Sequence, residues 1–253
     1  MRAIIEILGA KMATEHHFLL LAAYNNAVWC DTICRSHHVM GEFRETFWVN
    51  HHKTPIYYPN LITLSPMAAI TPHQGALVEL LTGRQDYTIS VKDSFAILDL
   101  APFGFHQLFQ AQWIFRQGST DLAPQITADL QWKQITAESE LLRWEDAWSA
   151  PTSSHERLFL PALLHDADIC IIAAYKESQI VAGAIVNRTT EVVGLSNVFT
   201  PEQEAERYWE GLLSAIAACY PALPIVGYER DDSLAVALHV GFATLGPLRV
   251  WMR

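Results

Sequence analysis

The chain has 253 residues, of which 51% are hydrophobic and 17% are charged. This composition excludes a disordered chain, because burial of apolar surface can offset the entropy lost on folding. The formal net charge of −10 argues against a nucleic-acid or anionic-membrane surface, since both need a basic face. Four cysteines are too few for a disulfide framework, and no uninterrupted apolar run approaches the roughly 18 residues that span a bilayer. We therefore expect a cytoplasmic protein, in an oligomeric state that the sequence leaves open.

The first half of the chain is predicted to combine helices with short extended segments. Thr14 is a suitable N-cap for a long helix that ends near His38, and either Met1 or Met12 can start the chain ahead of it. The other predicted elements are an extended segment at 56–64 with an edge or bulge at Pro59, a short helix at 76–83, two strands within 86–100 around a Lys92–Asp93 turn, and a helix at 105–116.

The second half follows a linker at 116–125 that is rich in turn-forming residues, so we expect two lobes, 1–125 and 126–253. Antiparallel strands mixed with helices predict an α+β fold. The predicted elements are a strand at 128–135, a helix at 136–148 capped by Thr136, a short irregular segment at 158–166, three antiparallel strands within 167–199, a helix from Pro201 to about Ala218, a strand at 224–229, a helix at 231–240 that ends at Gly241, and an extended segment at 242–253.

This order of elements resembles the GNAT superfamily of acyl-CoA N-acyltransferases. The segments that carry the resemblance are "IVAGAIV" (180–186), "VVGLSNVFT" (192–200), "IVGYE" (225–229) and "ALHVGFATLG" (237–246). The resemblance covers residues 128–253, about half of the chain. It implies a mixed, mainly antiparallel sheet flanked by helices. The first half is then either a second, diverged copy of the fold or a separate addition.

The resemblance also implies where acetyl-CoA binds. In the family, the strand that corresponds to 192–199 separates from its neighbour and leaves a slot for pantetheine. This implies cofactor contacts from Ser196, Asn197 and Val198. Asn197 is unusual in a buried strand, and the alternative for it is a bulge satisfied by the neighbouring backbone.

The start of the long helix departs from the family pattern. A glycine-bearing loop there normally brings backbone N–H groups close to the diphosphate of acyl-CoA. Here Thr200 and Gln203 are predicted to form a capping box, and Pro201 removes one donor. The charged residues that follow are Glu202, Glu204 and Glu206. This turn is therefore predicted to stabilise the helix rather than to bind a diphosphate.

The resemblance implies two catalytic positions. A tyrosine four residues before the glycine of "GF" often protonates the leaving thiolate, but that position holds Ala237. A carboxylate at the end of the strand after the long helix can act as the base for an attacking amine, and Glu229 has that place. The ordinary alternative is that Glu229 pairs with Arg230 or with solvent.

Two other groups of residues are candidate sites on the predicted first helix. Cys30, Cys34, His37 and His38 lie near one helical face, which a metal ion can use. We favour a helix with two buried thiols and a histidine-rich last turn, and so we predict no metal. Cys30 also has no confident base partner for a nucleophilic role.

Asp31 and Arg35 form an i,i+4 pair that is typical of a protein surface, and Tyr24 shares their face. If this face lines a cleft, the three side chains are candidates to bind a zwitterionic metabolite.

Two functions remain open on this basis. The first is an acyltransferase that transfers an acyl group from acyl-CoA to an amine of a small molecule, with Glu229 as the base and the first half covering the substrate cleft. The second is a non-catalytic relative that kept the fold, lost the diphosphate loop, and binds a small polar metabolite or a protein partner.

Overall fold

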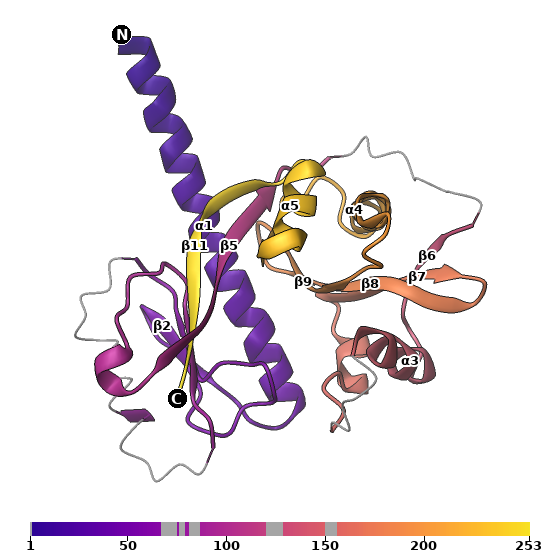
Figure 1. The fold of residues 1–253 in the computed structure, drawn as a ribbon, viewed down its shortest axis with the longest axis horizontal. Coiled ribbons are helices and arrows are strands. Elements are labelled where there is room, and N and C mark those ends of the chain that lie inside the picture. Colours follow the sequence, from indigo (N-terminus) through magenta and orange to yellow (C-terminus); the bar gives the residue numbers. More distant parts are fainter. Residues whose placement is uncertain (1, 67–74, 76–78, 81–86, 120–128, 150–155) are drawn as a thin grey trace. The chain divides into compact units, whose positions relative to one another are not determined.

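The computed structural model describes residues 2–66, 75, 79–80, 87–119, 129–149 and 156–253 (Figure 1). The chain divides into two compact units. Unit 1 is Met1–Trp113 together with Leu245–Arg253, and unit 2 is Ile114–Thr244. The predicted boundary near residue 125 lies outside the described residues. Each unit is described by itself below.

Unit 1 contains a long helix, α1 (Arg2–Ser36), and a small mixed sheet. Its neighbouring strands pair antiparallel, except for one parallel pair between β3 and β4. In sheet order, these strands are β1 (Glu42–Phe43), β2 (Phe47–Val49), β3 (Leu61–Thr63), β4 (Ser90–Asp93) and β11 (Ala243–Met252). The core of the unit includes Phe47, Leu61, Val91 and Trp251.

The sequence predictions for unit 1 needed several corrections. The helix α1 begins at Arg2, well before the predicted cap at Thr14. Lys92 and Asp93 do not form a turn, because both are buried within strand β4. Of the predicted extended segment at 56–64, only β3 is a strand, and Tyr57 has a positive φ of 73° in a turn before it. The predicted helix at 76–83 lies mostly outside the described residues.

The predicted helix at 105–116 is wrong. The segment follows a short 3₁₀ helix, η1 (Ala101–Phe103), and forms the strand β5 (His106–Arg116), which runs from unit 1 into unit 2. Ala111 and Trp113 are both buried, and they lie two residues apart, which is the spacing of one face of a strand. The packing of these two side chains selects the strand over the helical pattern of the local sequence.

Unit 2 is built around strands that pair antiparallel, except for one parallel pair between β9 and β10. In sheet order, the strands are β10 (Ile225–Glu229), β9 (Val193–Phe199), β8 (Gln179–Arg188), β7 (Ile169–Lys176) and β6 (Gln131–Gln134). The three consecutive strands predicted within 167–199 are confirmed. The whole chain is therefore of the α+β class, with mixed, mainly antiparallel strands, as predicted.

Helices cover both faces of the unit 2 strands. Figure 1 shows α4 (Ala205–Cys219) and α5 (Asp231–His239) on one face of β8 and β9, and α3 (Glu138–Trp148) on the other. A short 3₁₀ helix, η2 (Pro161–His165), precedes β7. Because both faces are covered, the first six residues of β7 are all buried. The predicted inward residues of α4 are confirmed as buried: Tyr208, Trp209, Leu212, Leu213 and Ile216.

The ends of two unit 2 helices illustrate what local patterns do and do not predict. Gly241 follows α5 with a φ of 95°, which confirms the predicted left-handed helix stop. The predicted N-cap of α3 is wrong, because Ala137 rather than Thr136 occupies that position and no side chain caps the helix.

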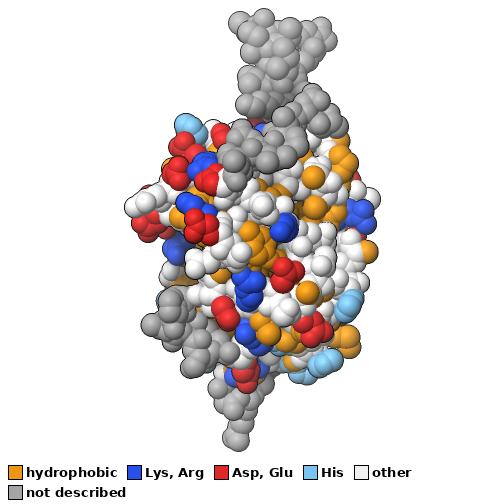
Figure 2. All heavy atoms as spheres, turned by 90° about the vertical axis from the view of Figure 1, so that its right-hand side faces the viewer, with side chains coloured by type: hydrophobic (Ala, Val, Ile, Leu, Met, Phe, Trp, Pro, Cys, Tyr) orange, Lys and Arg blue, Asp and Glu red, His pale blue; other side chains and the backbone are white. Residues whose placement is uncertain are grey.

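Two surface properties bear on possible partners. No helix within the described ranges is long and apolar enough to cross a membrane. On the face shown in Figure 2, acidic and basic side chains are interspersed, so this face offers no extended basic surface of the kind that binds nucleic-acid phosphates.

Candidate functional site

The first feature of the site is the place where β9 and β10 stop pairing. The parallel ladder joins Val193 to Ile225 and Gly194 to Val226. Both strands continue beyond these pairs, β9 to Phe199 and β10 to Glu229, but no further pair joins β9 to β10 among the described residues. The β9–β10 ladder therefore ends before the C-terminal parts of both strands, which hold the site residues predicted from the sequence.

The second feature is a β-bulge in β9. Gly183 of β8 is opposite Phe199, and Ile185 is opposite Ser196, so two steps along β8 match three steps along β9. Asn197 lies within the bulge and has a φ of 55°, a left-handed conformation that asparagine tolerates better than most residues. The bulge of the alternative interpretation is present, but no hydrogen bond from the described backbone satisfies the Asn197 side chain, and contacts of Ser196, Asn197 and Val198 with a cofactor stay a prediction.

The Asn197 side chain forms no hydrogen bond with any described residue, so its role in the bulge is conformational. We expect Asn197→Ala to lower the free energy of unfolding by about 1 kcal/mol, because alanine is strained at a positive φ. Asn197→Gly is expected to be close to neutral, because glycine adopts this conformation without strain. Urea denaturation of the three proteins measures the difference, and an equal loss in both variants would show that the amide group itself is required.

The third feature is Glu229, at the end of β10. Its side chain is partly buried, and the desolvation of its carboxylate by the surrounding protein raises its pKa to about 7. No ion pair or hydrogen bond joins this carboxylate to another described residue. The alternative pairing with Arg230 is not observed, since the Arg230 guanidinium lies 3.6 Å from Asp231 instead. Glu229 is therefore a carboxylate that exchanges a proton near neutral pH.

The start of α4 lies just after β9 and differs from the sequence prediction. The helix begins at Ala205, so Pro201 is not its first residue and the Thr200–Gln203 capping box does not form. Glu204 is the N-cap, in a left-handed conformation with a φ of 61° and without a side-chain cap.

The charge at this helix start remains acidic. Glu204 contacts Arg207 at 3.5 Å, and Arg207 also pairs with Asp129. Glu206 faces His239 of α5 at 3.3 Å. Arg207 and His239 therefore already have acidic partners, and this acidic helix start does not suit a diphosphate.

The remaining sequence candidates lie in unit 1 or in the core. Ala237 is fully buried in the core of unit 2, so this position offers no acid. The two oxygens of Asp31 are already engaged, by the Trp48 indole N–H at 3.0 Å and by Arg35 at 3.0 Å. Tyr24 is exposed and packs against Phe43 rather than against that pair. The structure thus joins Asp31 to Arg35, but not Tyr24 to either.

Cys30 and Cys34 lie in α1, whereas His37 and His38 lie in the turn after it. In the part of the chain that is described, no cluster of three metal-binding side chains is found. Cys30 and Cys34 are buried, and burial raises the pKa of both thiols, which disfavours a nucleophilic thiolate. Sequence reasoning missed the buried Lys92 of β4, whose ammonium group donates a 2.7 Å hydrogen bond to Asn26 of α1. Lys92 was missed because the sequence predicted a turn at this position, where a lysine is expected to be exposed.

Comparison with known proteins gives similarity at the level of structure. No protein-family model matches the sequence, and no curated protein matches it significantly. A GCN5-related N-acetyltransferase from Kribbella flavida is 14% identical, with a TM-score of 0.66 over 91% of this chain and 95% of that chain. A conserved protein of unknown function from Staphylococcus epidermidis is 11% identical, with a TM-score of 0.59 over 87% and 96%.

A tandem GNAT protein from the clavulanic acid biosynthesis pathway is 13% identical, with a TM-score of 0.51 over 82% of each chain. At these identities the matches establish the fold and not the activity. Together with the order of strands in unit 2, they show that the chain has the fold of the GCN5-related N-acetyltransferases.

Proposed function

We propose that the protein is an N-acyltransferase, in which Glu229 of unit 2 removes a proton from the amine of a small-molecule acceptor. The observation that carries this proposal is the desolvated Glu229 carboxylate, with a pKa of about 7, at the end of β10 and three residues beyond the last β9–β10 pair. A general base works best when its pKa is close to the working pH, and burial has moved this carboxylate into that range.

Residues at the end of β9 would bind the acyl donor, and a residue at the end of β10 would bind the acceptor amine. An acyl-CoA would supply the acyl group as a thioester. Ser196, Asn197 and Val198 would hold the pantetheine arm along β9, where the bulge changes the direction of the backbone groups. Glu229, from the neighbouring strand, would orient the amine and accept its proton. For unit 1 we propose a diverged copy of the same fold, in line with the similarity of the chain as a whole to a tandem GNAT protein.

The diphosphate of acyl-CoA is the part that this site does not fit. Glu204 and Glu206 stand in or next to the first turn of α4, where like charge opposes a phosphate. The proposed binding energy therefore comes from the pantetheine and acyl portion of the donor alone.

This misfit gives a sharp test of the proposal. Acylation of a panel of small primary amines is measured by thiol release, once with acetyl-CoA and once with S-acetylpantetheine, which lacks the diphosphate. We expect turnover with both donors and values of kcat/KM that agree within about tenfold, because the diphosphate adds little binding energy. A preference for acetyl-CoA of more than about a thousandfold would show that the protein holds the diphosphate elsewhere.

A second function is favoured by one specific observation, the acidic and self-paired start of α4. It is a non-catalytic member of the fold that binds a small polar metabolite or a protein partner. The same experiment separates the two, since the absence of thiol release with either donor contradicts acyl transfer. Binding of amino acids, measured by calorimetry with Arg35→Ala as the comparison, then tests the face around Asp31.

A further inference from the structure

The two cysteines of unit 2 lie next to each other although they are 49 residues apart in the sequence. Cys170 is the second residue of β7, and Cys219 is the last residue of α4. Their sulfur atoms are 3.4 Å apart, at hydrogen-bonding distance. A disulfide needs the sulfurs to approach to about 2.05 Å, so a shift of little more than 1 Å separates this contact from a bond.

The two thiols differ in access to solvent. Cys170 is 2% exposed, whereas Cys219 is exposed at the protein surface. A reagent from solution therefore reaches Cys219 first. Cys170 is accessible mainly to the Cys219 sulfur.

The two thiols also differ in pKa, and the more exposed Cys219 has the lower value. Either sulfur can be the donor in this contact; with Cys170 as the donor, the hydrogen bond stabilises the Cys219 thiolate and lowers the pKa of Cys219 to about 7. The same hydrogen bond, and then burial, raise the pKa of Cys170. The C-terminal end of α4 by itself disfavours a negative charge. The hydrogen bond from Cys170 is therefore the feature that makes Cys219 reactive near neutral pH.

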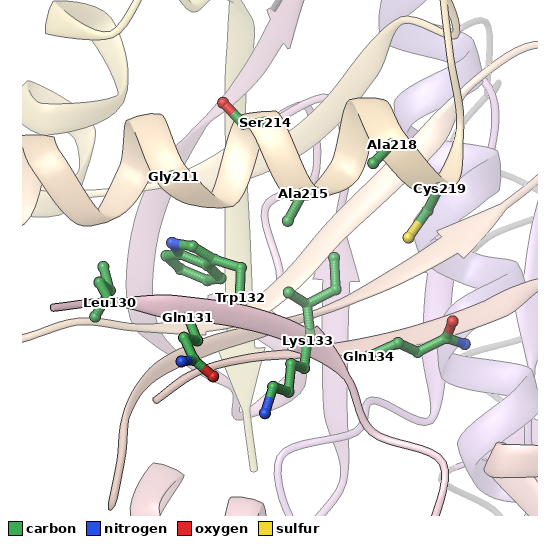
Figure 3. Close-up of a pocket in the computed structure, with 11 residues that line it drawn as sticks. Leu130, Gln131, Trp132, Lys133, Gln134, Gly211, Ser214, Ala215, Ala218 and Cys219 are labelled. Carbon is green, nitrogen blue, oxygen red and sulfur yellow. The ribbon is translucent and has the colours of Figure 1, made fainter. Parts of the chain in front are cut away.

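Cys219 also lines a groove that is large enough for a small-molecule reagent. The groove has a volume of about 520 Å³ and lies between β6 and the second half of α4. Figure 3 shows the Cys219 sulfur on the side of α4 that faces β6, with Ala215 and Trp132 further along the groove. The Gln134 side chain, which also lines the groove, can bind polar groups of such a reagent.

From this geometry we propose that Cys219 and Cys170 form a thiol-modification site that reacts with low-molecular-weight disulfides of the glutathione type and closes to an intramolecular disulfide. The Cys219 thiolate attacks one sulfur of the reagent, forms a mixed disulfide and releases one thiolate. Cys170 then loses its proton to solvent and attacks the Cys219 sulfur, which releases the second thiolate. Two protein thiols are oxidised, and the reagent is reduced to two thiols. The product ties the end of α4 to β7.

The test treats the full-length protein with oxidised glutathione at pH 7.5 and measures its intact mass and its Cys-containing peptides. We expect the wild-type protein to lose two hydrogen masses and to yield one linked peptide pair that contains Cys170 and Cys219. Cys30 and Cys34 serve as the internal control, because both are buried and should remain free thiols.

Two variants separate the steps of the reaction. Cys170→Ser is expected to stop at the mixed disulfide and to gain one glutathionyl group on Cys219, whereas Cys219→Ser is expected not to react. Circular dichroism of both variants confirms that they are folded. The proposal is overturned if the wild-type protein stays fully reduced, or if it accumulates the mixed disulfide to the same extent as Cys170→Ser.

A third measurement remains informative if Cys170→Ser retains part of the hydrogen bond. In Cys170→Ala, alkylation of Cys219 by iodoacetamide at pH 7 is expected to be about tenfold slower than in the wild-type protein, because the thiolate fraction falls. An unchanged rate would show that Cys170 does not activate Cys219.

Discussion

Replacing Glu229 by glutamine is expected to lower kcat/KM for amine acylation at least about a hundredfold, since the variant has no carboxylate to accept the proton. Glutamine keeps the shape of the side chain, so binding of the donor should change little. In the wild-type protein, kcat/KM should fall as the pH drops below about 7, where the Glu229 carboxyl becomes protonated.

The matched control is Glu210→Gln, on the exposed side of α4 and outside the proposed site. This variant is expected to keep wild-type activity and the wild-type pH profile. Steady-state kinetics between pH 5.5 and 9 measure both quantities. An active Glu229→Gln enzyme that keeps the fall near pH 7 would assign the base to another residue.

The same substitution has a stability effect with a defined sign. The pKa of Glu229 is about 7 in the folded protein, and a glutamate in the unfolded chain has a pKa of about 4.3. The folded state thus binds this proton more tightly. Its stabilising contribution is complete below the unfolded pKa and is lost as the pH rises through the folded pKa, for a total of about 3 kcal/mol.

Glu229→Gln removes this titration. The variant should match the wild-type protein near pH 4 and exceed it in free energy of unfolding by about 3 kcal/mol at pH 8. Urea denaturation at both pH values measures the difference. A difference that does not change with pH would mean that the carboxylate is not desolvated in the folded protein.

Replacing Gly183 by alanine is expected to destabilise unit 2 by about 3 kcal/mol. Gly183 lies in β8, opposite Phe199 of β9. A methyl group there would lie 2.7 Å from the Ile172 carbonyl oxygen, 2.8 Å from the Phe199 ring, and closer still to the Trp144 indole nitrogen. Backbone and packed rings surround the position, so no flexible side chain can move aside.

The glycine has a structural consequence for the site as well. It makes room for the fully buried Trp144, whose indole N–H donates a 2.9 Å hydrogen bond to the Ile172 carbonyl. The Trp144 ring also packs edge-on against Phe199, at 5.3 Å between centroids. Gly183→Ala should therefore disturb the end of β9, next to the bulge at Asn197.

A double-mutant cycle with Trp144→Phe tests this interpretation. Removing the indole nitrogen relieves one of the three clashes, so Gly183→Ala should cost at least about 1 kcal/mol less in the Trp144→Phe background. Gly75→Ala is the control and should carry no steric cost, because among the described residues outside its own helix backbone no atom lies within 4 Å of the added methyl group. Additive costs in the cycle would show that the contacts with the Ile172 carbonyl and the Phe199 ring cause the loss without the Trp144 nitrogen.

Local sequence patterns were sufficient to predict most of the secondary structure of unit 2. The strands within 167–199, the inward face of α4 and the stop at Gly241 follow from periodicity and from the conformational freedom of glycine, which act over a few neighbouring residues. The same kind of pattern failed for β5 and for the Lys92–Asp93 segment of β4. Both segments are strands because of partners far along the chain, and a local window contains no information about those partners.

The groups available at the site can be read from the amino-acid sequence: a carboxylate at the end of β10, an asparagine in β9, and glutamates instead of glycines at the start of α4. Their properties depend on the folded environment. The pKa of Glu229 depends on desolvation by the surrounding protein, and the contact between Cys170 and Cys219 depends on the packing of α4 against β7. Desolvation and close contact arise between residues that are distant in sequence, and so they exist only once the chain has folded.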